Sequence, residues 1–87
     1  MKALTLRYFA ALRELVGHER ETLLIPESGL TLSELVELLS DVHGAEVAEA
    51  LIGPGVRLAL NDELVDGEPR LVLPGDVVAF LPPVTGG

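Results

Sequence analysis

The chain ends in residues 82–87, Pro-Pro-Val-Thr-Gly-Gly, in which two glycines follow a proline pair. Because proline fixes φ and has no N–H to donate, Pro82 and Pro83 are expected to end a strand and direct the chain outward. Gly86 and Gly87 have no side chain, so the terminal carboxylate can enter a narrow channel in another protein and be activated there. At about 3.3–3.6 Å per residue, an extended 82–87 segment would reach about 20 Å. The sequence therefore predicts an extended tail with its chemistry at the carboxylate of Gly87.

Other residue types that carry chemistry are few. The sequence has no cysteine, which excludes disulfides, thiolate metal sites and a cysteine nucleophile. His18 and His43 are far apart and lack the spacing of metal ligands, so both are expected to be surface histidines. Two pairs of acids stand at helical spacing and are expected to be solvated: Glu34 with Glu37, and Glu46 with Glu49.

Composition and charge narrow the classes of protein. The chain has 87 residues, 48% of them hydrophobic and 23% charged, which indicates one globular domain. A net charge of -8, from 14 acidic and 6 basic residues, argues against nucleic acid as a partner and favours proteins with basic surfaces. The N-terminal stretch is interrupted by Arg7, Arg13 and Glu14, and no apolar run approaches the ~18 residues of a membrane span. We therefore expect a cytoplasmic protein with no membrane partner.

Alternating hydrophobicity predicts the strands. Over residues 3–9 it places Leu4, Leu6 and Tyr8 toward the core and Phe9 on the opposite face. Further strands are expected over residues 20–25, 56–60, 63–65, 71–73 and 77–81, with turns at Asp66-Gly67 and at residues 74–76. The segment 77–81 is apolar on both faces, as is typical of a strand in the middle of a sheet.

One substantial helix is predicted, with shorter helices beside it. Thr31-Leu32-Ser33-Glu34 matches a capping box at its start, and Gly44 is expected to end it. The apolar stripe expected to be buried comprises Leu32, Leu35, Val36, Leu39 and Val42. Short helices are expected over residues 10–16, closed by Gly17, and 45–51. This element order predicts an α+β domain over residues 1–81, with the main helix on one face of a mixed sheet, followed by the tail of residues 82–87.

Three parts of the sequence resemble the small, sulfur-carrying subunit of molybdopterin synthase. They are residues 9–17 (FAALRELVG), Asn61 in its hairpin, and residues 75–87, whose Pro-Pro-Val-Thr-Gly-Gly ending is more specific than a bare Gly-Gly. The resemblance runs nearly end to end and implies a ubiquitin-like β-grasp fold with the first and last strands side by side. The chain departs from the family pattern at Val77, where an acid is frequent, and at Leu81, where an aromatic residue is common.

The resemblance also implies a function. A partner of the ubiquitin-activating type would adenylate the Gly87 carboxylate with ATP, and a sulfur donor protein would then supply the sulfur that replaces one oxygen. The Gly86-Gly87 end, now a thiocarboxylate, would enter the large synthase subunit and give its sulfur to cyclic pyranopterin monophosphate. The chain itself would bind no cofactor or metal. The catalytic residues would belong to the large subunit, in an assembly expected to be a heterotetramer.

Strand alternation and the resemblance together predict the partner-binding residues. If the first and last strands are neighbours, Phe9 and Leu81 share an outward face, with Leu64 of the nearby hairpin as a third member. Exposed apolar clusters on small domains commonly mark partner sites. The alternative is that Phe9 folds under the short helix as core. The other residues expected to contact partners are Arg13, Pro82, Pro83, Val84 and Thr85.

Two alternative functions remain open from the sequence. A Gly-Gly end also suits a free-standing sulfur carrier for thiamin or tRNA thiolation, or a protein modifier joined through Gly87 to lysines. The large subunit that co-purifies would distinguish these. The other alternative is a β-grasp binding module without chemistry, in which the tail is an ordinary loose chain end. In that case, removing the tail would have no effect on function.

Overall fold

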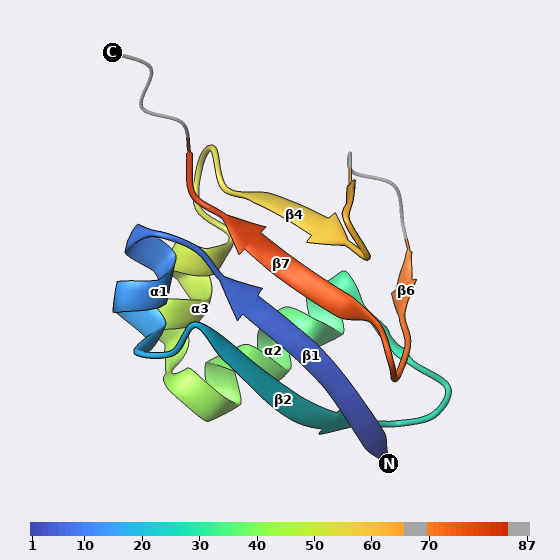
Figure 1. Ribbon diagram of the computed structural model, residues 1–87. Coiled ribbons are helices and arrows are strands. Elements are labelled where there is room, and N and C mark those ends of the chain that lie inside the picture. The colour runs from blue at the N-terminus through green and yellow to red at the C-terminus, as the bar shows by residue number, and fades with distance from the viewer. Residues whose placement is uncertain (66–69, 84–87) are drawn as a thin grey trace.

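The computed structural model describes residues 1–65 and 70–83, which form seven strands and three helices (Figure 1). The expected turn at Asp66-Gly67 and the tail residues Val84, Thr85, Gly86 and Gly87 lie outside the described residues. In chain order the elements are β1 (Lys2–Tyr8), α1 (Ala11–Val16), β2 (Arg20–Ile25), β3 (Leu30–Thr31), α2 (Leu32–His43), α3 (Ala45–Leu51), β4 (Arg57–Leu60), β5 (Glu63–Leu64), β6 (Leu71–Val72) and β7 (Val77–Leu81).

The main sheet has five strands in the order β2-β1-β7-β4-β5. β1 and β7 run parallel, with Tyr8 opposite Phe80, whereas the β1–β2, β4–β7 and β4–β5 pairs are antiparallel. The first and last strands are therefore neighbours in the middle of a mixed sheet, as expected.

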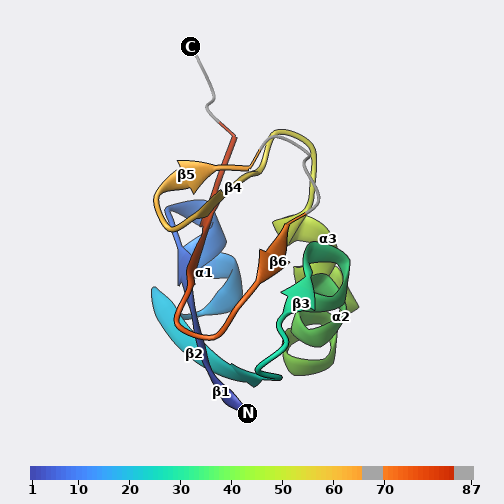
Figure 2. The same cartoon turned by 90° about the vertical axis from the view of Figure 1, so that its right-hand side faces the viewer.

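A second, two-stranded sheet was not predicted. β3 pairs with β6 antiparallel, so that Leu30 lies opposite Val72 and Thr31 opposite Leu71 (Figure 2). Each strand has two residues, which is too short to show alternation in the sequence. The pairing has a clear effect on packing, because it buries Val72 completely beside the start of α2.

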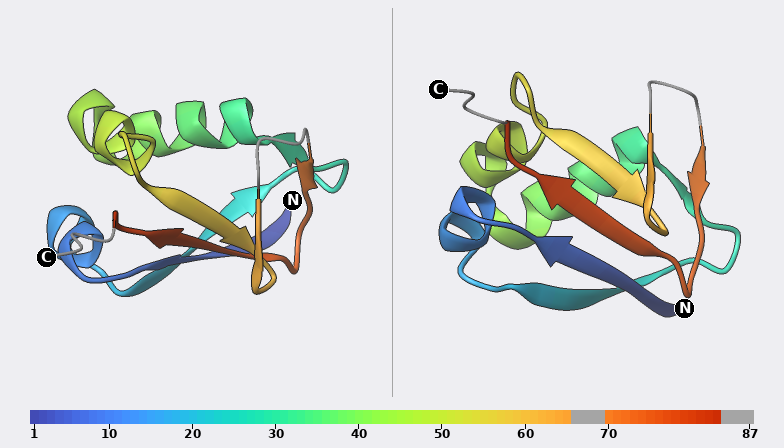
Figure 3. Two further views of the ribbon diagram at one scale, coloured as in Figure 1. Left: turned by 90° about the horizontal axis from the view of Figure 1, so that it is seen from above. Right: turned by 45° about the horizontal axis from the view of Figure 1, so that its top comes forward.

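α2 and α3 cover one face of the main sheet and leave the other face open (Figure 3, left). α2 begins at the predicted capping box: the Glu34 N–H donates to Thr31 Oγ1 at 3.1 Å, and the Thr31 N–H donates to Glu34 Oε1 at 2.9 Å. Leu35 and Leu39 are buried as predicted, but Val42 is 48% exposed. The prediction for Val42 was wrong because the buried stripe continues from Leu39 to His43, one helical turn further on.

The hydrophobic core lies between the sheet and the helices. Alternation in β1 and β7 places the core side chains as predicted, and the Tyr8 and Phe80 rings stack with centroids 5.5 Å apart. Full burial of such a side chain contributes about 1.5–3 kcal/mol to stability. The core cluster comprises Leu4, Leu6, Tyr8, Leu12, Ile25, Leu35, Leu39, Leu51, Leu60, Val72, Val78 and Phe80. Across residues 1–65 and 70–83, no helix has the length and apolar character needed to span a membrane.

Candidate protein-docking site

The face of the main sheet turned away from α2 and α3 carries the candidate site. We call it the outer face. Its strand register defines one row of residues across all five strands, because each pairs directly with the next. From β2 to β5 the row reads Arg20, Arg7, Ala79, Ala59 and Leu64. Two arginines thus stand at one side of the sheet, two small alanines in its middle and a leucine at the far side.

A hollow of about 360 Å³ opens over these alanines. Its lining residues are Arg7, Phe9, Ala59, Asp62, Leu64, Val77, Ala79 and Leu81. The three apolar residues predicted to form a patch are therefore brought together, and two alanines without large side chains leave room between them. Apolar side chains thus make up most of the lining of the hollow, as they do in the centre of many protein–protein interfaces.

Phe9 lies just beyond the end of β1, and its N–H donates to the Phe80 carbonyl at 3.3 Å. Its side chain is only partly buried, and the Arg7 guanidinium lies over its ring at 4.9 Å. The alternative in which Phe9 folds under α1 as core is wrong, because Phe9 is only partly buried and lines the hollow, whereas Leu12 of α1 is 7% exposed and belongs to the core cluster.

The base of the tail lies at the same end of the sheet. Pro82 and Pro83 follow β7 directly and have no strand pairing, as predicted. Gly55 lies against Pro83, and a Cβ added to Gly55 would stand 2.7 Å from the Pro83 Cβ. The sequence did not predict this contact, because the Gly-Pro-Gly run of residues 53–55 indicates a loop but gives no signal for what the loop touches.

Asn61 fixes the hairpin that carries Leu64. Asn61 and Asp62 both have positive φ, 50° and 71°, which suits a tight β4–β5 turn. The Asn61 side chain accepts from the Val77 N–H at 2.9 Å and donates to Asp76 Oδ1 at 2.9 Å. The sequence singled out Asn61 by resemblance alone, and the structure gives its role: it ties this turn to the start of β7.

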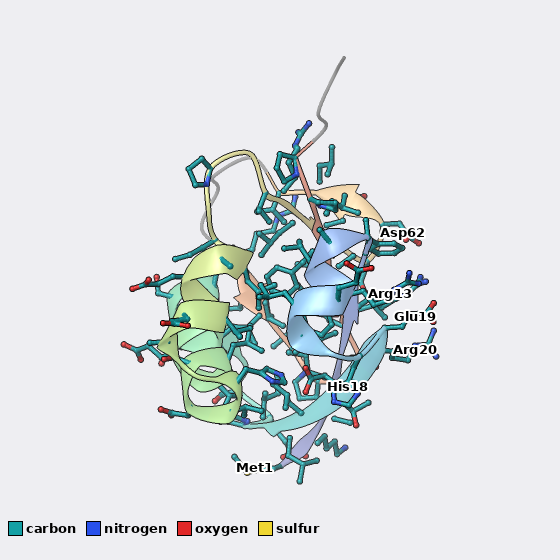
Figure 4. All side chains as sticks on the ribbon, turned by 90° about the vertical axis from the view of Figure 1, so that its left-hand side faces the viewer. Met1, Arg13, His18, Glu19, Arg20 and Asp62 are labelled. Carbon is teal, nitrogen blue, oxygen red and sulfur yellow. The ribbon has the colours of Figure 1, made fainter. Side chains whose placement is uncertain are left out.

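The remaining predicted contact residue among those described is Arg13. It lies on α1 with its side chain exposed, outside the residues that line the hollow. Figure 4 shows Arg13, Glu19, Arg20 and Asp62 on the side of the molecule away from α2 and α3. The four predicted contact or reacting residues 84–87 lie outside the described residues.

His43 is not the surface histidine that was expected. Its Nε2 lies 2.6 Å from Glu21 Oε2, which also accepts a hydrogen bond from the Tyr8 hydroxyl at 2.7 Å. Burial, and then the bond to Glu21 and its charge, raise the pKa of Tyr8 above its ordinary value. Three residues from β1, β2 and α2 thus form a part-buried polar network on the helix side of the sheet. His18 is exposed, as expected.

The acids at helical spacing are exposed on α2 and α3, as predicted. Within the described part of the chain, no group of three or more potential metal ligands comes together.

The sequence profile of the ThiS family matches residues 6–87, so the chain belongs to the ThiS family. Two curated relatives are molybdopterin synthase sulfur carrier subunits. The one from Mycosarcoma maydis is 31% identical over 83 residues, covering 92% of this chain and 88% of that protein. The one from Aspergillus niger is 34% identical over 85 residues, covering 94% of this chain and 91% of that protein.

Solved structures share the ubiquitin-like β-grasp fold. A putative molybdopterin converting factor subunit 1 from Pyrococcus furiosus matches with a TM-score of 0.73 and 28% identity, over 97% of this chain and 100% of that one. A chain from a complex of subunits 1 and 2 of molybdopterin-converting factor from Helicobacter pylori matches with a TM-score of 0.64 and 27% identity. The match covers 98% of this chain and 99% of that one. Small archaeal modifier protein 1 from Methanosarcina acetivorans, at 21% identity and a TM-score of 0.72 over 100% and 98%, shares the fold.

Proposed function

We propose that this chain is the sulfur-carrier subunit of a molybdopterin synthase. The observation that carries the proposal is the apolar hollow of the outer face, which lies at the base of a Pro-Pro-Val-Thr-Gly-Gly ending. The two sulfur carrier relatives and the solved two-subunit complex support it. In this proposal the large subunit docks on Phe9, Leu64 and Leu81 and receives the tail that begins at Pro82.

The chemistry is proposed to take place at the terminal carboxylate of Gly87. A carboxylate is a poor electrophile, because its oxygen is a poor leaving group. An adenylyltransferase of the ubiquitin-activating type would join it to AMP from ATP, releasing pyrophosphate. Sulfur at the oxidation level of sulfide, supplied by a donor protein, would then attack the carbonyl carbon and displace AMP, leaving a thiocarboxylate whose sulfur is ionised at neutral pH and nucleophilic. In the large subunit, two such transfers to cyclic pyranopterin monophosphate would build the dithiolene.

The chain's own part is to carry and present the reacting group. Gly86 and Gly87 offer no side chain to a narrow channel, and the absence of cysteine means that the sulfur has no other thiol on this chain to which it could be lost. The body of the protein supplies recognition, through the outer face. Catalytic residues, ATP binding and any metal used with ATP are assigned to the partners.

Intact mass spectrometry tests the proposal. The protein is incubated with its adenylyltransferase, ATP and a sulfur donor, and we expect the mass to change by the exchange of one oxygen for sulfur, mapped to Gly87. A reaction without ATP is the control. An unmodified C-terminus with a partner of proven activity would contradict the carrier role. Thiocarboxylate that forms but gives no sulfur to the pterin in the presence of the large subunit would favour another thiolation pathway, and lysine-linked conjugates would favour a protein modifier.

A further inference from the structure

Three arginines on the side of the outer face have no ion pair within the described residues. They are Arg7, Arg13 and Arg20; Lys2 and Arg70, by contrast, have Glu27 and Glu63 as ion-pair partners. The two acids that share this side in Figure 4, Glu19 and Asp62, form no ion pair with these arginines either. In a chain with 14 acidic and 6 basic residues, unpaired basic side chains on one face need a physical reason.

Arg7 and Arg20 stand directly opposite each other across β1 and β2. Directly opposed side chains in an antiparallel pair have Cβ atoms about 4.5–5.5 Å apart, and two like charges there destabilise the pair. On its other side Arg7 pairs with the neutral Ala79 of β7. The free protein thus keeps two cations side by side with no acid next to them in the row, although the chain has 14 acidic residues.

Arg7 is also held in place for binding. Its guanidinium lies over the Phe9 ring at 4.9 Å, and it lines the hollow beside that ring. Its Nε is buried and has no hydrogen-bond partner among the residues that the structure describes. A guanidinium that is oriented by an aromatic ring and already partly removed from water loses little further freedom or hydration on meeting a carboxylate, and binds it strongly.

We infer that Arg7 and Arg20 together bind an aspartate or glutamate side chain of the large subunit, beside an apolar side chain that sits in the hollow over Ala59 and Ala79. This inference rests on the proposed function and adds the chemistry of the partner: an apolar residue flanked by an acid. Charge complementarity selects a protein carboxylate over a nucleic acid phosphate, because the chain as a whole has a net charge of -8.

The test is the affinity of the full-length protein for its cognate large subunit, measured by calorimetry at low and high NaCl concentration. We expect Arg20→Glu and Arg7→Gln each to weaken binding about tenfold or more at low salt, as the loss of a charge-assisted hydrogen bond does. High salt should weaken wild-type binding and reduce the difference between the proteins. Lys2→Glu, which reverses a charge on the same strand outside the row, is the matched control and should change the affinity less than about twofold.

Stability of the free chain provides a second measurement. Arg20→Gln removes the like-charge contact, so its melting temperature should equal or exceed that of the wild type while its affinity falls. If Arg20 had only a structural role, Arg20→Gln would lower both the melting temperature and the affinity. The inference would be wrong if Arg7→Gln and Arg20→Glu bound the large subunit with wild-type affinity. It would also be wrong if the affinity did not depend on salt.

Phe9→Asp, measured beside these variants, separates this inference from the proposed docking. If Phe9→Asp abolishes binding while the arginine variants bind normally, the docking face stands and the carboxylate inference is wrong. If Phe9→Asp also binds normally, the proposed docking itself is wrong.

Discussion

Phe9 lies where the core strand β1 passes into α1, and it faces away from the core that Leu4, Leu6 and Tyr8 fill. Strand parity places it on the outer face, and the Arg7 guanidinium keeps its ring in position at 4.9 Å. The ring is only partly buried and lies beside a hollow lined by two alanines. Large aromatic side chains in such positions are common anchors of protein–protein interfaces.

We expect Phe9→Asp and Leu81→Asp each to weaken binding to the large subunit by about 2 kcal/mol or more, since a carboxylate in the docked hollow would be desolvated without a partner. Affinity and melting temperature are measured together. Leu24→Asp is the matched control, because Leu24 is a 63% exposed leucine of β2 that does not line the hollow. Unfolding caused by either substitution would instead assign that residue to the core.

The buried hydroxyl of Tyr8 predicts that the protein loses stability at alkaline pH. Burial first, and then the neighbouring Glu21, raise the pKa of Tyr8 above its ordinary value of 10.0. In the unfolded chain the hydroxyl ionises at its ordinary pKa, so the stabilising effect of neutral Tyr8 is complete below pH 10 and is lost as the pH rises above it. The free energy of unfolding should fall by up to about 1.4 kcal/mol per pH unit in that range.

Urea unfolding at pH about 8 and about 11 measures this loss. Tyr8→Phe is the control: Tyr8 is the single tyrosine of the chain, so the variant should lose less stability between the two pH values than the wild type. Equal losses in both proteins would assign the alkaline effect to other groups.

At the scale of elements, the start of α2 is held by side-chain hydrogen bonds that the sequence predicts. Thr31→Ala removes the acceptor for the Glu34 N–H and should lower the free energy of unfolding by about 1 kcal/mol, measured by urea denaturation. Ser33→Ala, an exposed change two positions further on, should have a smaller effect. If the two variants were equally stable, the capping box would contribute nothing measurable.

The sequence predicted the elements whose pattern is local. Alternation located β1, short runs bounded by turn residues located β2 and β4, a continuous apolar run located β7, and the capping box located the start of α2. The resemblance put β1 beside β7, and parity then brought Phe9 and Leu81 together on one face. Where a short-range pattern and one known strand pairing were enough, the candidate site could be predicted.

The features that could not be predicted depend on contacts between distant residues. The β3–β6 pairing joins two-residue segments some 40 positions apart, between Leu30 and Val72. The His43 side chain turns toward the sheet, where it contacts Glu21 of β2. The apolar pattern of the helix does not show this contact. The opposition of Arg7 and Arg20 follows from the β1–β2 register, which is defined only once both strand boundaries are known.

At the scale of the whole molecule, the two faces of the main sheet differ: α2 and α3 cover one (Figure 3), and the other carries the hollow. Figure 4 shows Arg13 and Arg20, together with Glu19 and Asp62, on the side away from α2 and α3. The hollow lined by Arg7, Ala59 and Ala79 lies on the outer face. The tail begins where β7 ends, at the edge of that same hollow, because Leu81 lines the hollow and Pro82 follows it directly. A partner docked on the outer face would therefore meet the base of the tail at the same time.

Gly55 links the 53–55 loop to the direction in which the tail leaves. A Cβ there would stand 2.7 Å from the Pro83 Cβ, so Gly55→Ala should displace Pro83 and slow sulfur transfer severalfold, measured by single-turnover kinetics with the large subunit. Gly75→Ala is the matched control. Gly75 has a similarly positive φ, 91° against 82°, but an added Cβ has no neighbour within 4 Å. Both variants should lose similar stability from backbone strain, and equal transfer rates would show that the Pro83 contact does not guide the tail.

The last prediction separates the tail from the body. Deleting Gly87, extending the chain beyond it, or replacing Gly86 with valine should abolish adenylation and thiocarboxylate formation, because a narrow channel that accepts two glycines has no room for a branched side chain or a displaced carboxylate. The melting temperature should stay within about 1 °C of the wild type, since the core cluster formed by the described residues ends at Phe80. Intact mass after incubation with the adenylyltransferase, ATP and the sulfur donor measures the first effect, and thermal unfolding measures the second. Thr85→Ala, which shortens a side chain at the approach to the glycines, is the matched control and should still be thiolated. A Gly86→Val protein thiolated at the wild-type rate would contradict the narrow channel while leaving the docking face untouched.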